Sequence, residues 1–182
     1  MPVTTRSFTS EKSRAATPAP RRPLPNVQDG RLGALHDGRM TTTQLQPRLV
    51  VRDAPKAIDF YVTALGAEEV ERYAEPSGKI VHCELRLGGH SFSLTEEDLD
   101  HSPSPLAVGG SGVLLRLTVP DADAVGQAME SGGAEVIIPI EARYYGPREG
   151  RLRDPFGHLW IISQEGEYLS PDEVQARIDQ GA

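Results

Sequence analysis

The fold is decided by residues 50–70, VVRDAPKAIDFYVTALGAEEV, which carry the signals of a strand, a helix and the start of another strand. Residues 46–51 are a predicted strand, and Asp53 follows as a helix N-cap with Pro55 in the first turn. Apolar side chains then recur at helical spacing up to Gly66, which is a natural C-cap. The stretch therefore predicts a strand followed at once by a helix.

Three further strands complete this unit. They are predicted over residues 67–73, 80–88 and 90–95. The first turn between them is Pro76-Ser77-Gly78, and the second is Gly88-Gly89. The order of elements is thus β-α-β-β-β.

The unit recurs at a nearly constant offset of 67 or 68 residues. The matching segments are 51–54 with 119–122, 66–68 with 133–135, and 89–90 with 157–158. Three separate matches at nearly one offset indicate an internal duplication, which has to be found before a fold is assigned. The second unit is predicted as strand 113–119, helix 121–131, and strands near 135–140, 150–153 and 158–164.

We therefore expect an α+β domain over residues 44–166, made of two repeated modules at 44–96 and 112–166. A C-terminal helix is expected within 167–182, where Ser170 and Glu173 have the spacing of a capping box. This helix is expected to be an appendage or to lie at a dimer contact.

The remaining N-terminal residues, 1–43, are predicted to be a disordered tail. Residues 1–39 are rich in Thr, Ser, Pro, Arg and Ala and show neither a strand nor a helix period. Met40 lies just before the first patterned segment and is a plausible second start. The tail is then either an artefact of an upstream start or a functionless extension, and a targeting or DNA-binding role for Arg21-Arg22 is the alternative.

Charge and composition exclude several classes of protein. The chain has a net charge of −7, and residues 1–39 hold seven basic and three acidic residues, so the rest carries −11. Nucleic acid is an unsuitable partner for so acidic a domain. No apolar run approaches the roughly 20 residues that a membrane helix needs, and no secretory h-region is present. The single cysteine, Cys83, is expected to be a buried structural thiol. A cytoplasmic protein without a membrane partner is expected.

Strand alternation sorts the side chains onto two faces. Apolar residues share one face of the first strand of each module and of the last strand of the second module, and this face is expected to pack under the two helices. The opposite face is mixed, and it places Arg48 and Arg116 at equivalent positions of the repeat. Two guanidinium groups facing one hollow could clamp a carboxylate. The alternative is that each arginine pairs with an acidic neighbour such as Glu84 or extends into water.

The duplication, together with residues 50–61, 65–69 and 153–160 (RDPFGHLW), resembles the vicinal-oxygen-chelate (VOC) superfamily of glyoxalases, bleomycin-resistance proteins and dioxygenases. Within it the sequence is most similar to the PhnB-like subgroup, because the 153–160 turn is followed by Ser-Pro-Asp-Glu at 170–173. The resemblance implies that the paired modules form a cup-shaped half-barrel. It also implies that a homodimer usually completes the cup.

In metal-dependent relatives the resemblance places a divalent ion in the cup, held by the first and last strands of both modules. Counting from the motifs puts these positions at Gln46, Ser93, Leu114 and Ile161. Leu114 and Ile161 have no donor atom, and one neutral amide cannot hold a hard cation. We therefore expect no metal and no cofactor, and we expect the four positions to line a partly apolar ligand site.

Four other residues are candidates for the site. Tyr144 and Tyr145, in the loop 142–150, are expected to stack on an aromatic ligand, or else to pack against a partner subunit. His82 and Glu84 are the candidates for a catalytic base, although Glu84 is also expected to pair with Arg48 or Arg116. At an offset of 68, Leu152 is the repeat mate of Glu84, and alternation then turns Arg151 and Arg153 to the other face.

Four functions are compatible with this sequence. The favoured one is a small-molecule-binding protein that sequesters an organic ligand in a metal-free cup, as antibiotic-binding relatives do. An acidic domain also attracts cationic guests. The alternatives are a metal-dependent lyase, isomerase or dioxygenase, a metal-independent enzyme that uses Glu84 or His82 as base, and a non-catalytic dimeric module.

Overall fold

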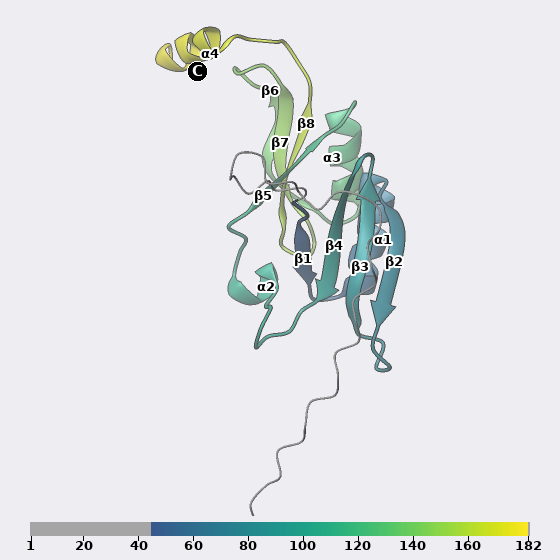
Figure 1. Ribbon diagram of the computed structural model, residues 1–182. Helices are drawn as coiled ribbons and strands as arrows, with labels where there is room; N and C mark the ends of the chain where they lie inside the picture. The colour runs from purple at the N-terminus through teal and green to yellow at the C-terminus, as the bar shows by residue number, and fades with distance from the viewer. Residues whose placement is uncertain (1–44, 182) are drawn as a thin grey trace, which may run out of the picture. The chain divides into compact units, whose positions relative to one another are not determined.

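The computed structural model describes residues 45–181 (Figure 1). The expectation that residues 1–43 are disordered concerns residues outside this range. The described part of the chain contains, in order, β1 (Arg48–Val51), α1 (Ala54–Leu65), β2 (Glu68–Ala74), β3 (Ile80–Leu87), β4 (His90–Glu96), α2 (Pro105–Val108), β5 (Leu114–Thr118), α3 (Ala122–Ser131), β6 (Glu135–Ala142), β7 (Arg148–Arg153), β8 (Leu159–Gln164) and α4 (Pro171–Asp179). No helix in the described part of the chain is long and apolar enough to cross a membrane.

The strands form two four-stranded mixed sheets with the same topology. Their orders are β1-β4-β3-β2 and β5-β8-β7-β6. In each sheet the first and last strands of the module are parallel, and the other pairs are antiparallel. The predicted duplication of a β-α-β-β-β unit and the α+β class are therefore confirmed. Within residues 45–181, strands pair only with strands of the same sheet.

The helix ends follow the local sequence signals. The Asp53 carboxylate accepts a hydrogen bond from the Lys56 amide, and Asp121 does the same for Ala124 at the start of α3. Gly66 ends α1 in the left-handed region at φ 69°, where a side chain would be strained. Ser170 and Glu173 form the predicted capping box at the start of α4.

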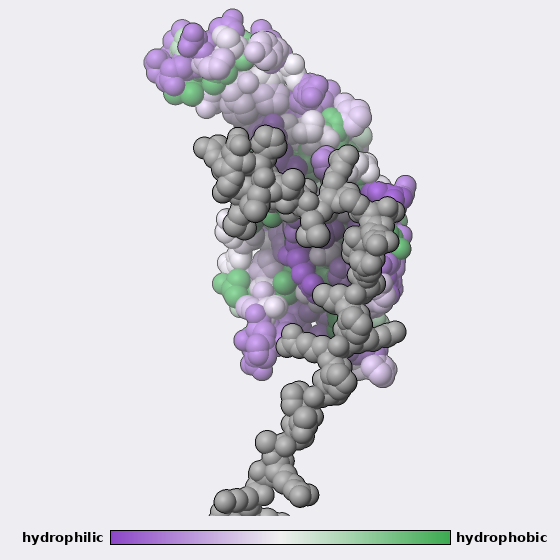
Figure 2. Space-filling model, in the orientation of Figure 1, coloured by the Kyte–Doolittle hydropathy of each residue, from purple (hydrophilic) through white to green (hydrophobic). Residues whose placement is uncertain are grey.

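Two helices depart from the main pattern. The short helix α2 was not predicted, because its four residues are too few to show a helical period. The helix α4 was predicted, but it buries no residue, and its surface is mostly hydrophilic in the space-filling view (Figure 2). Neither helix therefore adds much to the core.

The core lies on the face of each sheet that α1 and α3 cover, and the two helices contact each other. It contains a cluster of aromatic rings whose neighbouring centroids are 5.5–6.2 Å apart, formed by Phe60, Tyr61, Phe92, Phe156 and Trp160. Edge-to-face contacts of this kind add to the free energy of apolar burial. Because the rings come from both modules, the cluster fixes one module against the other.

A buried carboxylate completes the contact between the modules. Asp154 is 3% exposed and accepts hydrogen bonds from the Tyr61 hydroxyl at 2.7 Å and the Trp160 indole at 2.9 Å. Its other oxygen accepts the amides of Phe156 and His158, each at 2.9 Å. The carboxylate thus joins α1 to the β7–β8 turn.

His158, in the β7–β8 turn, is buried against the first module. It is 8% exposed, and its Nε2 lies 3.1 Å from the carbonyl oxygen of Val50 in β1. Burial lowers the pKa of His158, opposed by the charge of Asp154. The ring therefore packs between the modules, because the β7–β8 turn folds back onto the core.

Cys83 is buried, as predicted, and this makes its chemistry testable. Burial raises the pKa of the Cys83 thiol to about 11 from an ordinary value of 9.0. At a pH below the pKa, each unit by which the pKa rises lowers the thiolate fraction tenfold. Alkylation of Cys83 at pH 8 should therefore be at least about 100-fold slower than alkylation of an exposed thiol. The rate of iodoacetamide labelling should rise with pH and on addition of urea. Equal labelling of native and unfolded protein would contradict this burial.

Candidate functional site

The face of each sheet that the helices leave uncovered, here called the open face, carries the predicted site residues. Gln46 and Ser93 lie on the open face of the first sheet, and Leu114 and Ile161 on that of the second. Gln46 donates a hydrogen bond from Nε2 to the Ser91 hydroxyl at 3.2 Å. The four positions are thus divided between the sheets, and the second sheet contributes only hydrocarbon.

Arg48 and Arg116 lie on the open faces of different sheets and have different partners. An Arg48 Nη2 donates to the carbonyl oxygen of Val81 at 2.8 Å. An Arg116 Nη2 donates to the Ser163 hydroxyl at 2.8 Å and lies 2.7 Å from Oε2 of the buried Glu149. The prediction that Glu84 pairs with one of them is wrong, because both guanidinium groups bind nearer acceptors. The clamp of two arginines on one ligand stays a prediction.

The register of β7 corrects a second prediction. Arg151, not Leu152, lies opposite Ile161 on the open face. Leu152 is fully buried and pairs with Trp160 on the helix-covered face. Glu84 pairs with Ser93 in the first module, so its true repeat mate is Arg151, at an offset of 67 residues. The offset of 68 assumed in the prediction assigned Leu152, instead of Arg151, to the open face of β7.

Arg151 lies in a hollow on the second open face, here called the β7 cavity. Its volume is about 220 Å³, and it is lined by Ile138, Arg143, Tyr144, Tyr145, Glu149, Gly150, Arg151 and Ile161. The Nε of Arg151 is buried, and no group of residues 45–181 forms a hydrogen bond with it. The cavity thus combines an unpaired guanidinium nitrogen with aromatic and aliphatic walls.

Two tyrosines form one wall of the β7 cavity. Their rings are edge-to-face, with centroids 4.9 Å apart. The Tyr145 hydroxyl donates to Glu149, and burial, with this carboxylate, raises the pKa of Tyr145. Tyr144 is 39% exposed, and its carbonyl oxygen accepts a hydrogen bond from Arg177 of α4 at 2.9 Å. Tyr145 is therefore fixed, whereas the Tyr144 ring is open to solvent and to a ligand.

The cavity brings three predicted residues together, namely Tyr144, Tyr145 and Ile161. Sequence reasoning missed Arg151 and Glu149, although polar residues at 149, 151 and 153 alternate with Gly150 and Leu152. That alternation alone was a signal that the polar side chains share a face.

A larger hollow of about 980 Å³ runs along the edge strand β5. Its walls are residues 114–119, the β3–β4 hairpin at 87–92 and the end of α1 at 65–66. It contains Leu114 and Arg116 from the predicted site. Its polar side chains are Arg116 and Thr118 of β5 and His90 and Ser91 of β4, and within residues 45–181 none of these has a buried polar atom without a hydrogen-bond partner.

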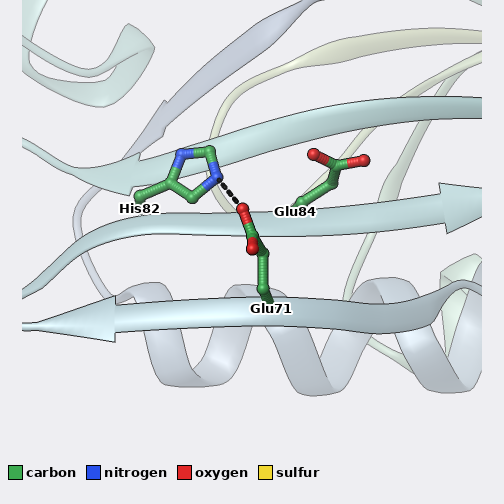
Figure 3. A group of neighbouring side chains, drawn as sticks. All are labelled: Glu71, His82 and Glu84. Atoms are coloured by element: carbon green, nitrogen blue, oxygen red, sulfur yellow. Dashed lines mark ion pairs between the residues drawn. The ribbon is translucent and has the colours of Figure 1, made fainter. Parts of the chain in front are cut away.

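The two candidate bases, His82 and Glu84, lie on the open face of the first sheet beside Glu71 (Figure 3). One ligand atom from each residue lies within 4.8 Å of the others. The His82 Nε2 is 3.4 Å from a Glu71 carboxylate oxygen. Glu71 was not predicted, because its place depends on a bulge in the pairing of β2 with β3.

Comparison with known proteins gives the family. Residues 42–162 match the profile of the Glyoxalase/Bleomycin resistance protein/Dioxygenase superfamily. An uncharacterized protein of Mycobacterium tuberculosis is 40% identical over 136 residues, which cover 72% of this chain and 80% of that protein. The solved structure of an Arabidopsis thaliana gene product has a TM-score of 0.56 and 29% identity, covering 68% of this chain and 99% of the other.

The fold also occurs in a fosfomycin resistance protein, FosX, from Listeria monocytogenes. The TM-score is 0.57 at 18% identity, and the match covers 74% of this chain and 99% of that one. At this identity the likeness concerns the fold alone.

Proposed function

The chain belongs to the Glyoxalase/Bleomycin resistance protein/Dioxygenase superfamily, and on that premise we propose that it binds and sequesters a small organic molecule on its open face. The ligand is a small planar carboxylate, bound in the β7 cavity. The proposal includes no metal at the four positions of metal-dependent relatives, because Leu114 and Ile161 supply no donor atom there.

The observation that carries the proposal is the buried, unpaired Nε of Arg151. An unsatisfied buried donor costs free energy, and a charged one costs more. A guanidinium group presents parallel N–H donors that match the two oxygens of a carboxylate. A ligand carboxylate would satisfy this nitrogen, which residues 45–181 leave without a hydrogen bond, once a rotation of the Arg151 side chain turns the buried Nε toward the cavity.

The other walls of the β7 cavity favour a ligand whose carboxylate is attached to an aromatic ring. Tyr144 offers a ring face, and Ile161 and Ile138 offer aliphatic surface. An apolar cavity of about 150 Å³ holds benzene, so the β7 cavity has room for a single ring and its carboxylate. The domain is acidic as a whole, but the local guanidinium group decides the sign of the ligand, since charges further than a Debye length are screened.

The subgroup and the oligomeric state of this chain are part of the same proposal. The PhnB-like subgroup stays a prediction that rests on the turn at 153–160. A homodimer also stays a prediction, supported by two features of residues 45–181: β1 and β5 are edge strands of their sheets, and some apolar residues are exposed, such as Val113 at 63%.

Replacing Arg151 by methionine should weaken carboxylate binding by about 10- to 100-fold, the range that hydrogen bonds to a charged group provide. Binding of benzoate, salicylate and 4-hydroxybenzoate to the full chain can be measured by isothermal titration calorimetry. The matched control is Arg153→Met, because Arg153 lies outside the cavity and pairs with Glu135 at 3.0 Å. That variant should bind like the wild type.

Two outcomes would reject the proposal. One is equal binding by the wild type and Arg151→Met, which would place the ligand elsewhere. The other is chemical conversion of the ligand, tested by mass spectrometry of the compound recovered after incubation. Recovery of unchanged ligand is expected for a sequestering protein, whereas a new product would indicate an enzyme.

A further inference from the structure

We propose that Glu71, His82 and Glu84 form a binding site for a divalent transition-metal ion on the open face of β2 and β3. The site uses none of the four family positions, and it is independent of the β7 cavity on the other sheet. It therefore goes beyond the proposed function, and its failure would leave that proposal standing.

The register of two strands brings the three side chains together. Glu71 of β2 lies directly opposite Glu84 of β3, and Tyr73 lies opposite His82. His82 and Glu84 are two residues apart on one strand, so they share a face. Figure 3 shows the three side chains gathered on the same side of the sheet. One ligand atom of each lies within 4.8 Å of those of the other two. A single ion could contact all three after small side-chain rotations.

The charges at this place are unbalanced without a cation. Like charges directly opposite one another in an antiparallel pair are destabilising. The neighbouring carboxylates of β2 are neutralised, Glu68 by Arg86 and Glu69 by Arg72. Among residues 45–181, by contrast, no lysine or arginine is within ion-pair distance of Glu71 or Glu84.

Glu84 is the strongest part of this argument. It is half-buried, yet its carboxylate forms no hydrogen bond or ion pair within the described residues. Neither of its oxygens is fully buried, so solvent, and therefore an ion, can reach the carboxylate. Arg48 is two strands away in the same register, but its guanidinium binds the Val81 carbonyl oxygen. A cation between Glu71 and Glu84 would bind this carboxylate without having to displace a protein partner from it.

Tyr73 supports the geometry from outside the site. Its hydroxyl donates to the second oxygen of Glu71 at 2.8 Å, and its ring stacks on His82 with centroids 5.8 Å apart. Hydrogen bonds to a ligating carboxylate fix its orientation in metal sites. The contact leaves the other Glu71 oxygen turned toward the His82 Nε2, 3.4 Å away.

The donor set selects the class of ion. One imidazole and two carboxylates suit Zn²⁺, Mn²⁺ or Fe²⁺, whereas Ca²⁺ requires six to eight oxygen ligands. Three protein ligands leave at least one coordination position for water. The site is therefore expected to bind Zn²⁺ and Mn²⁺ with a solvent ligand and to discriminate against Ca²⁺.

The test is metal binding by the untagged full chain, measured by calorimetry with Zn²⁺ and Mn²⁺ and by the visible absorption of bound Co²⁺. About one equivalent per chain is expected. The variants Glu84→Gln and His82→Ala should each lower the affinity at least tenfold. Loss of His82 should also change the Co²⁺ spectrum, because a nitrogen ligand is removed.

Two matched controls distinguish this site from metal binding elsewhere on the open face. Glu68→Gln removes a carboxylate of the same strand outside the site, and Gln46→Ala removes the one family position with an amide. Both should bind metal like the wild type, and unchanged thermal unfolding would show that each variant is folded. The proposal is overturned if no stoichiometric metal binds, if Glu84→Gln binds normally, or if Gln46→Ala abolishes binding.

Discussion

Replacing Asp154 by alanine should lower the free energy of unfolding by about 4 kcal/mol, because it leaves several buried donors without an acceptor. The carboxylate is 3% exposed and accepts from Tyr61, Trp160 and two backbone amides. Each buried donor that loses its partner costs about 1–3 kcal/mol, and partial access of water to the cavity reduces the sum. The change can be measured by urea unfolding followed by tryptophan fluorescence.

Two variants calibrate this result. Tyr61→Phe removes one of the four hydrogen bonds and keeps the ring, so it should cost about 1–2 kcal/mol. Asp123→Ala breaks an exposed ion pair with Arg148 and should have a much smaller effect than either. If Asp154→Ala were no more destabilising than Tyr61→Phe, the four bonds would not act as one network.

The sequence was sufficient for the fold because the strongest signals are local or repeated. Asp53, Gly66 and Ser170 mark helix ends by their own side-chain chemistry, and the structure confirms all three. The duplicated segments then predict two modules of equal topology. A short helix such as α2 has no such signal, because four residues complete only one turn.

The candidate site was harder to predict because it depends on register. The turn between β7 and β8 spans residues 154–158, one residue more than the turn between β3 and β4 at 87–90. A shift of one residue exchanges the two faces of a strand. Applying a single offset to the whole module therefore assigned Leu152 to the open face, where Arg151 lies. The offset of 67 at residues 66–68 was already a sign that spacing varies along the repeat.

Glu71 was missed for a related reason. Strand alternation groups His82 with Glu84, but it cannot say which residue of β2 lies opposite them. That depends on register shifts between Glu69 and Glu71 and again after Tyr73. Bulges of this kind arise from the local twist of the pair and have no sequence pattern of their own here. A three-residue site spread over two such strands therefore becomes visible only in the structure.

The corrected register makes a second prediction with a large effect on stability. Leu152→Ala should lower the free energy of unfolding by about 3 kcal/mol, within the range measured for buried leucines. The side chain is fully buried opposite Trp160, on the face that the helices cover. Truncation removes apolar surface from the core and leaves a cavity between rigid strands, which can collapse only partly. Urea unfolding of the full chain measures the change.

The neighbouring Arg151→Ala is the matched test of the face assignment. It should change the free energy of unfolding by about 1 kcal/mol or less, because Arg151 forms no hydrogen bond or ion pair within residues 45–181. The two substitutions are adjacent on one strand and remove side chains from opposite faces. If the repeat offset were 68 in β7, their effects would be reversed, with Leu152→Ala tolerated and Arg151→Ala disruptive. A large loss for Leu152→Ala alone would establish that β7 turns its arginine, and not its leucine, to the open face.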